Sequence, residues 1–84
     1  MNHTAIARER RRDLRTLSRR LQAAEIKAQE LRHALDRRLY MWHDDGSSVT
    51  DLSLDAGISR ETVYRSLERF RAELASQGLA ETAR

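Results

Sequence analysis

The chain has 84 residues, no cysteine, no proline, and only four aromatic side chains among Phe, Trp and Tyr. A chain of this length builds one small core, which excludes a large enclosed active site, while the absence of cysteine excludes a disulfide framework and a thiolate zinc site. The net charge of +3 conceals an asymmetry, because residues 1–42 carry eleven basic and five acidic side chains whereas residues 43–84 carry five and eight. The positive potential therefore belongs mainly to the first half.

The first predicted element is one long helix. Residues 4–42 contain neither glycine nor proline and are rich in strong helix formers, which predicts a helix of about 58 Å. Apolar residues recur along it at spacings of three and four, as at the a and d positions of a coiled coil. We call this set the leucine seam: Leu14, Leu17, Leu21, Ala24, Ala28, Leu31 and Leu35. It predicts a homodimer, and the alternative is a stripe that packs within one chain.

Flanking charges bear on the orientation of the pair. In a parallel coil Arg20 faces Glu25 of the second chain favourably, while Lys27 faces Arg32 unfavourably. In the central antiparallel register Glu25 and Lys27 each meet their own copy. Charge therefore favours the parallel pair, which places the C-terminal segments of both chains at one end of the coil. The antiparallel pair, which places them at opposite ends, stays open.

The stretch "ARERRRDLRTLSRR" places seven arginines in thirteen residues at the start of this helix. Such a segment can contact phosphates, dock on an acidic protein, or simply be a solvated face. As candidate phosphate contacts the sequence offers Arg8, Arg10, Arg11, Arg12 and Arg15.

The next segment, "HDDGSS" at residues 43–48, is the only cluster of turn formers. After it, Ser48 caps a short helix, with Asp51 three residues on, and Gly57 ends that helix. Ser59 then caps a third helix that runs to about Gln77 and is closed by Gly78. The expected fold is all-α, with an Arg-rich coiled-coil helix at residues 1–36 and a three-helix domain at residues 37–84.

The apolar pattern of the three-helix domain predicts its core. Leu52 and Ala56 share one face of the second helix, and Ile58 follows in the turn. Along the third helix the stripe is Val63, Leu67, Phe70 and Leu74. Leu39 and Trp42, from the end of the long helix, are expected to pack on Val63, Leu67 and Phe70. The two short helices can share this core only by crossing steeply at Gly57, which is helix-turn-helix geometry.

The stretch "VTDLSLDAGISRETVYRSLERF", residues 49–70, resembles bacterial helix-turn-helix DNA-binding domains. Its second part, "GISRETVYRSLERF", is similar to the recognition segment of resolvase and invertase recombinases and of tetracycline-repressor-like regulators. The residues that carry the resemblance are Leu52, Ala56, Gly57, Ile58, Ser59 and Val63. Ser53 stands where these families usually have alanine, and no recombinase catalytic domain is present in these 84 residues.

The resemblance implies readout of double-stranded DNA, with the third helix in the major groove. It implies base or backbone contact by Ser59, Arg60, Glu61, Tyr64 and Arg65, and phosphate contact by Thr50 and Arg69. The alternative for Arg60, Glu61, Arg65 and Glu68 is a solvated face with favourable pairs four residues apart.

Other chemistry finds little support in the residues. No nucleophile with a base, no glycine-rich phosphate loop and no helical pair of histidines can be assembled, so we expect no enzyme, cofactor, small-molecule substrate or metal. We also expect no membrane span or signal peptide, and a cytoplasmic, nucleoid-associated location. The predicted function is a dimeric bacterial or phage transcription regulator, a repressor acting by occlusion. The alternative is an adaptor that docks an acidic partner through its Arg-rich coil.

Overall fold

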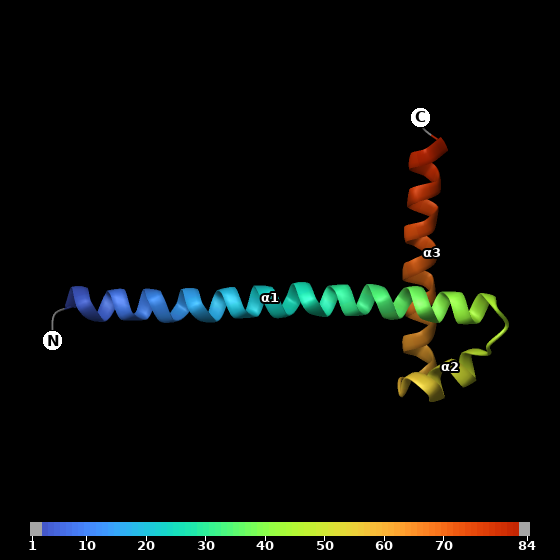
Figure 1. Ribbon diagram of the computed structural model, residues 1–84, viewed down its shortest axis with the longest axis horizontal. Helices are drawn as coiled ribbons and strands as arrows, with labels where there is room; N and C mark the ends of the chain where they lie inside the picture. The colour runs from blue at the N-terminus through green and yellow to red at the C-terminus, as the bar shows by residue number, and fades with distance from the viewer. Residues whose placement is uncertain (1–2, 83–84) are drawn as a thin grey trace. The chain divides into compact units, whose positions relative to one another are not determined.

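The computed structural model describes residues 3–82, with side chains up to Gly78. Over this range the chain forms three helices and no strand: α1 (His3–Asp44), α2 (Val49–Ala56) and α3 (Arg60–Thr82), which Figure 1 shows in order. The expected all-α fold with a long first helix is confirmed. The chain forms two compact units, Met1–Leu31 and Arg32–Arg84, so the last turns of α1 belong with α2 and α3.

The turn between α1 and α2 follows from its residue types. Gly46 adopts a positive φ of 110°, which favours glycine, and its N–H donates to the carbonyl of His43 at 3.0 Å. The Ser47 N–H donates to the carbonyl of Trp42 at 3.0 Å, and Nδ1 of His43 donates to the carbonyl of Ser47 at 2.9 Å. These bonds satisfy backbone groups that the end of a helix leaves free.

Both ends of α2 are capped as expected. The Ser48 hydroxyl accepts the N–H of Asp51 at 3.1 Å, and the carboxylate of Asp51 lies in the first turn, where the helix dipole favours negative charge. At the other end Gly57 is left-handed, with φ 69° and ψ 31°. Its N–H donates to the carbonyl of Leu54 at 3.3 Å, and the N–H of Ile58 donates to the carbonyl of Ser53 at 3.1 Å.

The expected end of the third helix at Gly78 is wrong, because α3 continues to Thr82. Glycine ends a helix when it turns into the left-handed region, and within residues 3–82 only Gly46 and Gly57 have positive φ. The sequence after Gly78 is "LAET", which holds no proline and can continue a helix. Gly78 is thus an interior residue of α3.

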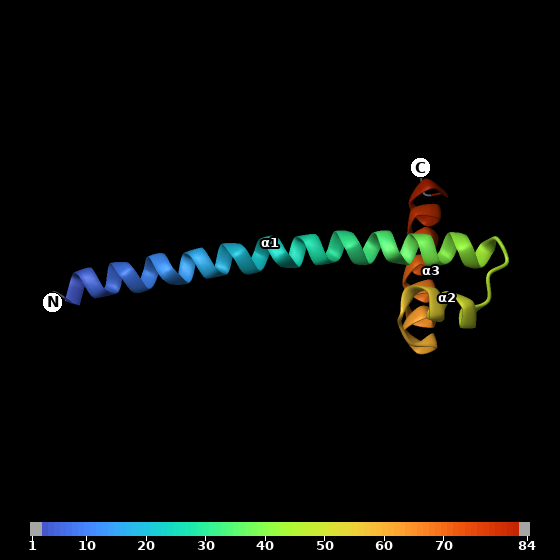
Figure 2. The ribbon, with the colours of Figure 1, turned by 60° about the horizontal axis from the view of Figure 1, so that its bottom comes forward.

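The core of the second unit lies where α2 and α3 meet the end of α1, an arrangement visible from two directions in Figures 1 and 2. Its buried apolar members are Leu39, Leu52, Val63 and Leu67, and Tyr40, Val49 and Ile58 pack against them. Phe70 is half-buried, with its ring centroid 5.0 Å from that of Tyr40. The predicted packing of Leu39 with Val63 and Leu67 is confirmed.

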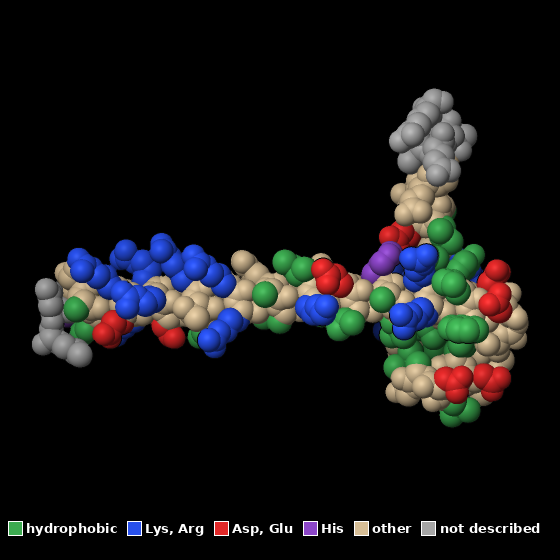
Figure 3. All heavy atoms as spheres, in the orientation of Figure 1, with side chains coloured by type: hydrophobic (Ala, Val, Ile, Leu, Met, Phe, Trp, Pro, Cys, Tyr) green, Lys and Arg blue, Asp and Glu red, His purple; other side chains and the backbone are tan. Residues whose placement is uncertain are grey.

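Three other predicted core residues lie outside the core. Trp42 is 58% exposed, Leu74 is 39% exposed, and Ala56 is exposed as well. Trp42 and Ala56 line an open groove of about 410 Å³ between the end of α1 and α2, together with Leu35, Arg38, Leu39, Ser47, Leu52 and Asp55. Figure 3 shows hydrophobic side chains gathered in this region. Trp42 lies on the side of α1 that faces this groove, so it does not pack in the α3 core.

Candidate nucleic-acid interface

The start of α3 is fixed by Ser59. Its hydroxyl accepts the N–H of Thr62 at 3.1 Å and lies 2.8 Å from the Thr62 hydroxyl, while its carbonyl accepts the N–H of Val63 at 3.1 Å. Ser59 is therefore the N-cap that the sequence predicts. Because the cap and the left-handed Gly57 lie two residues apart, the turn between α2 and α3 is tight, and within it the N–H groups of Gly57 and Ile58 are paired.

The first two turns of α3 have one buried and one exposed face. Val63, Ser66 and Leu67 are buried, whereas Arg60, Glu61, Tyr64 and Arg65 are exposed. Arg65 Nη2 donates to Glu61 Oε1 at 2.7 Å, a pair four residues apart on the helix surface. The structure thus brings the predicted contact residues of α3 together on one side of the helix.

Thr50, a predicted phosphate contact, is exposed in the first turn of α2. Its carbonyl accepts the hydroxyl of Ser53 at 2.8 Å. Ser53 is buried, and this internal bond satisfies the hydroxyl that it has in place of an alanine methyl. The serine is thereby accommodated at the helix crossing.

Arg69, the other predicted phosphate contact on these helices, has a protein partner. Its Nε donates to Asp36 Oδ2 at 2.6 Å, and its Nη2 donates to Asp36 Oδ1 at 2.9 Å. The two bonds form the bidentate geometry that guanidinium and carboxylate favour. Arg69 therefore joins α3 to α1 in this structure, although half of its side chain remains exposed.

Asp36 is the site residue that sequence reasoning missed. It is 4% exposed, and Oδ1 also accepts the hydroxyl of Ser66 at 2.5 Å. Burial acts to raise the pKa of this carboxyl, but the hydrogen bonds from Arg69 and Ser66, the positive charge of Arg69 and the electrostatic interaction with His33 outweigh it, so the pKa is lowered. The same bond raises the pKa of Arg69. Helical spacing could have indicated its burial, because Asp36 lies four residues before Tyr40, which packs on the core, and so shares a face of α1 with it.

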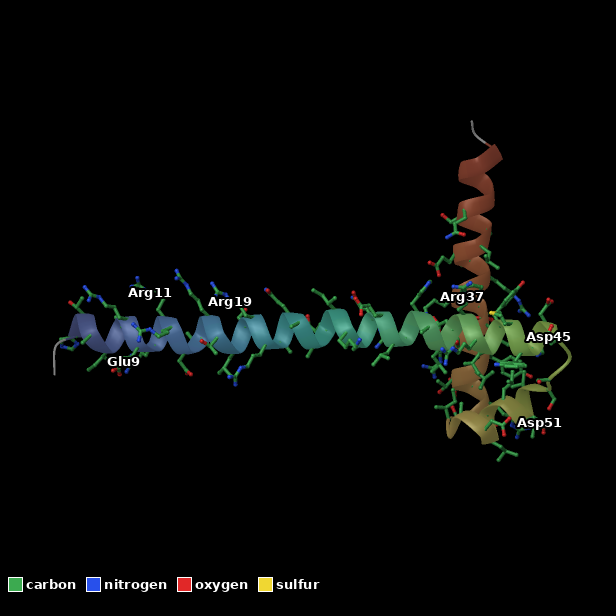
Figure 4. The ribbon with its side chains drawn as sticks, viewed as in Figure 1. Glu9, Arg11, Arg19, Arg37, Asp45 and Asp51 are labelled. Atoms are coloured by element: carbon green, nitrogen blue, oxygen red, sulfur yellow. The ribbon has the colours of Figure 1, made fainter. Side chains whose placement is uncertain are left out.

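The predicted phosphate contacts of α1 do not all lie on one face of the helix. Five arginines surround Thr16 along a shallow surface hollow of about 350 Å³; we call them the arginine face: Arg8, Arg11, Arg12, Arg15 and Arg19. Arg10, which the sequence grouped with them, is not among the lining residues, and Arg19 takes its place. In Figure 4 Arg11 and Arg19 project from one side of α1 and Glu9 from the other.

All members of the leucine seam are exposed, with Leu21 at 60%.

Among residues 3–82 no group of three or more His, Cys, Asp or Glu side chains could hold a metal ion. None of the described helices is both long and apolar enough to cross a lipid bilayer. Comparison with known proteins gives no match to a family, to a curated protein or to a solved structure.

Proposed function

We propose that this protein is a sequence-specific DNA-binding regulator that acts as a homodimer. In this proposal α2 and α3 form a helix-turn-helix, α3 enters the major groove, and the leucine seam joins two chains. The observation that carries it is the two-faced start of α3: a buried side at Val63 and Leu67, and an exposed polar side at Arg60, Glu61, Tyr64 and Arg65. A recognition helix needs this division, because one face must hold the fold while the other meets bases.

The exposed side chains supply the chemistry of base readout. Arg60 and Arg65 can each offer paired donors to a guanine, and Glu61 can accept from the amino group of a cytosine. The Glu61–Arg65 ion pair does not oppose this role, because exposed pairs four residues apart contribute only about 0.3–0.5 kcal/mol. A base or phosphate can replace such a partner at little cost.

The hydrogen bonds of Arg69 change which residues we propose as contacts to the DNA backbone. Thr50 is exposed near the start of α2 and remains a phosphate contact. Arg69 is instead a positioning residue, because both its Nε and its Nη2 are bound to Asp36. It holds α3 against α1 and so fixes the helix that reads the bases.

The dimer is supported by the exposed seam. A lone helix with leucines exposed at regular spacing leaves apolar area in water, and pairing two such helices removes it. The Arg20–Glu25 arrangement favours a parallel pair, which suits an operator with two half-sites. The proposed outcome is repression by occlusion of a promoter.

The proposal is tested by selection from a random duplex library with the full chain. A consensus of two half-sites is expected, and recovery of sequences without any consensus would overturn the proposal. On the selected site, Arg60→Ala or Arg65→Ala should lose about 1–3 kcal/mol of binding free energy, with much smaller losses on random duplex.

Arg37→Ala is the matched control, because Arg37 is an exposed arginine of the same unit that lies on α1 (Figure 4). It should bind the selected site like the wild type. Equal affinity of all three variants for the selected site would overturn the recognition role of α3. In that case the adaptor alternative is the one to pursue, with an acidic protein in place of DNA.

A further inference from the structure

The arginine face of α1 carries unpaired positive charge on one side of the helix. At 3.6 residues per turn, its centre lies about 140° around the helix from Leu14, Leu17 and Leu21. Asp13 lies toward the seam side, and Glu9 lies about midway between the seam and the arginine face. Figure 3 shows the resulting band of basic side chains along this part of α1.

None of these five arginines forms an ion pair with a residue in the described range. Several of them are also spaced four residues apart, where like charges repel and weaken a helix. These pairs are Arg8–Arg12, Arg11–Arg15 and Arg15–Arg19. The first turn of α1 also lacks an acidic residue to complement the helix dipole. This repulsion disfavours the bare helix, and a bound polyanion would relieve it.

We propose that the arginine face is a sequence-independent binding surface for the phosphate backbone of duplex nucleic acid. From Arg8 to Arg19 the helix rises about 16 Å, and a duplex presents about one phosphate charge per 1.7 Å of its axis. Several phosphates therefore lie within reach of the five guanidinium groups. Guanidinium also binds phosphate through paired hydrogen bonds.

Two other classes of anionic partner, an acidic protein and an anionic membrane, fit the arginine face less well than a duplex does. The anchors of protein–protein interfaces combine arginine with Trp and Tyr in desolvated pockets, whereas this shallow hollow is lined by arginines and Thr16 without an aromatic residue. The Thr16 hydroxyl already donates to the carbonyl of Arg12 at 3.0 Å. An interfacial membrane helix usually inserts Trp or Phe, and residues 1–31 contain neither.

The position of the face makes it compatible with a dimer, because a partner on the leucine seam would leave the opposite side of α1 uncovered. The inference also goes beyond the proposed function, since it requires no base readout. If α3 reads no bases, the arginine face still binds duplex. The protein would then hold DNA without selecting a site.

The test compares two double variants of the full chain that remove the same charge. Arg15→Gln with Arg19→Gln changes the arginine face, and Arg10→Gln with Arg37→Gln changes exposed arginines outside it. Each is titrated by fluorescence anisotropy on a random-sequence duplex across a salt series. Circular dichroism and sedimentation check that helix content and oligomeric state are unchanged.

The face variant should bind random duplex more weakly, with a salt slope shallower by about 1.8 for each bound protomer, as expected for two lost phosphate contacts. The control variant should keep the wild-type slope. Equal losses in both variants would show that total charge, not the face, governs binding, and an unchanged slope in the face variant would overturn the proposal.

Wild-type binding to polyglutamate or to vesicles of anionic phospholipid as tight as to duplex would overturn the assignment to nucleic acid. A failure of the proposed function looks different, since it leaves this salt dependence intact and removes only the preference for a selected site.

Discussion

Asp36 on α1 and Arg69 on α3 form a two-point ion pair, with Nε to Oδ2 at 2.6 Å and Nη2 to Oδ1 at 2.9 Å. The carboxylate is buried, and the guanidinium reaches it from a half-exposed position. Ser66 donates to the same carboxylate, so one acidic side chain collects three hydrogen bonds from α3. These bonds hold α3 against the end of α1.

Asp36→Asn should lower the free energy of unfolding by about 1–2 kcal/mol at neutral pH. It removes the charge that Arg69 pairs with, but Arg69 is half-exposed, so solvent screens part of the loss. Urea unfolding at fixed protein concentration measures the change. Asp45→Asn, in an exposed turn and without such a partner in the described residues, is the control and should alter stability by less than about 0.5 kcal/mol.

The same pair predicts a specific loss of stability in acid. Because the pKa of Asp36 is lowered in the folded protein, its contribution is full above the unfolded-state pKa of about 3.9 and disappears as the pH falls through the lower folded-state pKa. The stability difference between the wild type and Asp36→Asn should thus be constant above about pH 5 and should shrink below about pH 4. A difference that stays constant down to pH 2 would contradict this account.

Two glycines should respond in opposite directions to the same substitution. Gly57→Ala forces a side chain into a left-handed backbone at φ 69° and should destabilise by about 1 kcal/mol. Gly78→Ala lies within α3 and should stabilise by up to about 0.5–1 kcal/mol. An added Cβ meets no atom within 4 Å at either position, so the contrast isolates backbone conformation. Thermal unfolding of both variants at one concentration measures it, and destabilisation by Gly78→Ala would place that residue at a helix end after all.

The parts of this fold that could be predicted are those decided by neighbours in sequence. Ser48, Gly57 and Ser59 act within three or four residues of their own positions, and each behaves as expected. Gly78 shows the limit of the same reasoning, because glycine permits a left-handed turn without imposing one. The surrounding helix formers decide its conformation.

Tertiary contacts were harder to predict. Asp36 and Arg69 are separated by 33 positions, and nothing local marks them as partners. Periodicity showed that Trp42 lies on the apolar side of α1, but it could not show which part of that side meets α3. The grouping of the exposed arginines, in contrast, could have been predicted, because helical spacing alone separates Arg10 from Arg19. Whether α3 reads bases and whether the seam pairs remain predictions.

The core should be far more sensitive than the surface to loss of a leucine. Leu67 is 1% exposed, and Leu67→Ala should cost about 2–5 kcal/mol because it removes buried area and leaves a cavity. Leu54 is 74% exposed, so Leu54→Ala should change stability by less than about 0.5 kcal/mol. Equal effects in urea unfolding would mean that the packing of α2 and α3 differs from that described.

The leucine seam should control assembly, and the chain offers a close control. Leu21 and Ile26 are both apolar residues of α1 with nearly equal exposure, 60% and 58%, but only Leu21 occupies a seam position. In a paired coil Leu21→Asp would bury a charge without a partner, whereas the charge of Ile26→Asp would face water.

Sedimentation equilibrium at tens of micromolar should show a dimer for the wild type and Ile26→Asp. Leu21→Asp should be largely monomeric, and adding Leu31→Asp should complete the dissociation. A monomeric wild type at that concentration would contradict the dimer, and loss of assembly in Ile26→Asp alone would move the interface to the opposite face of α1.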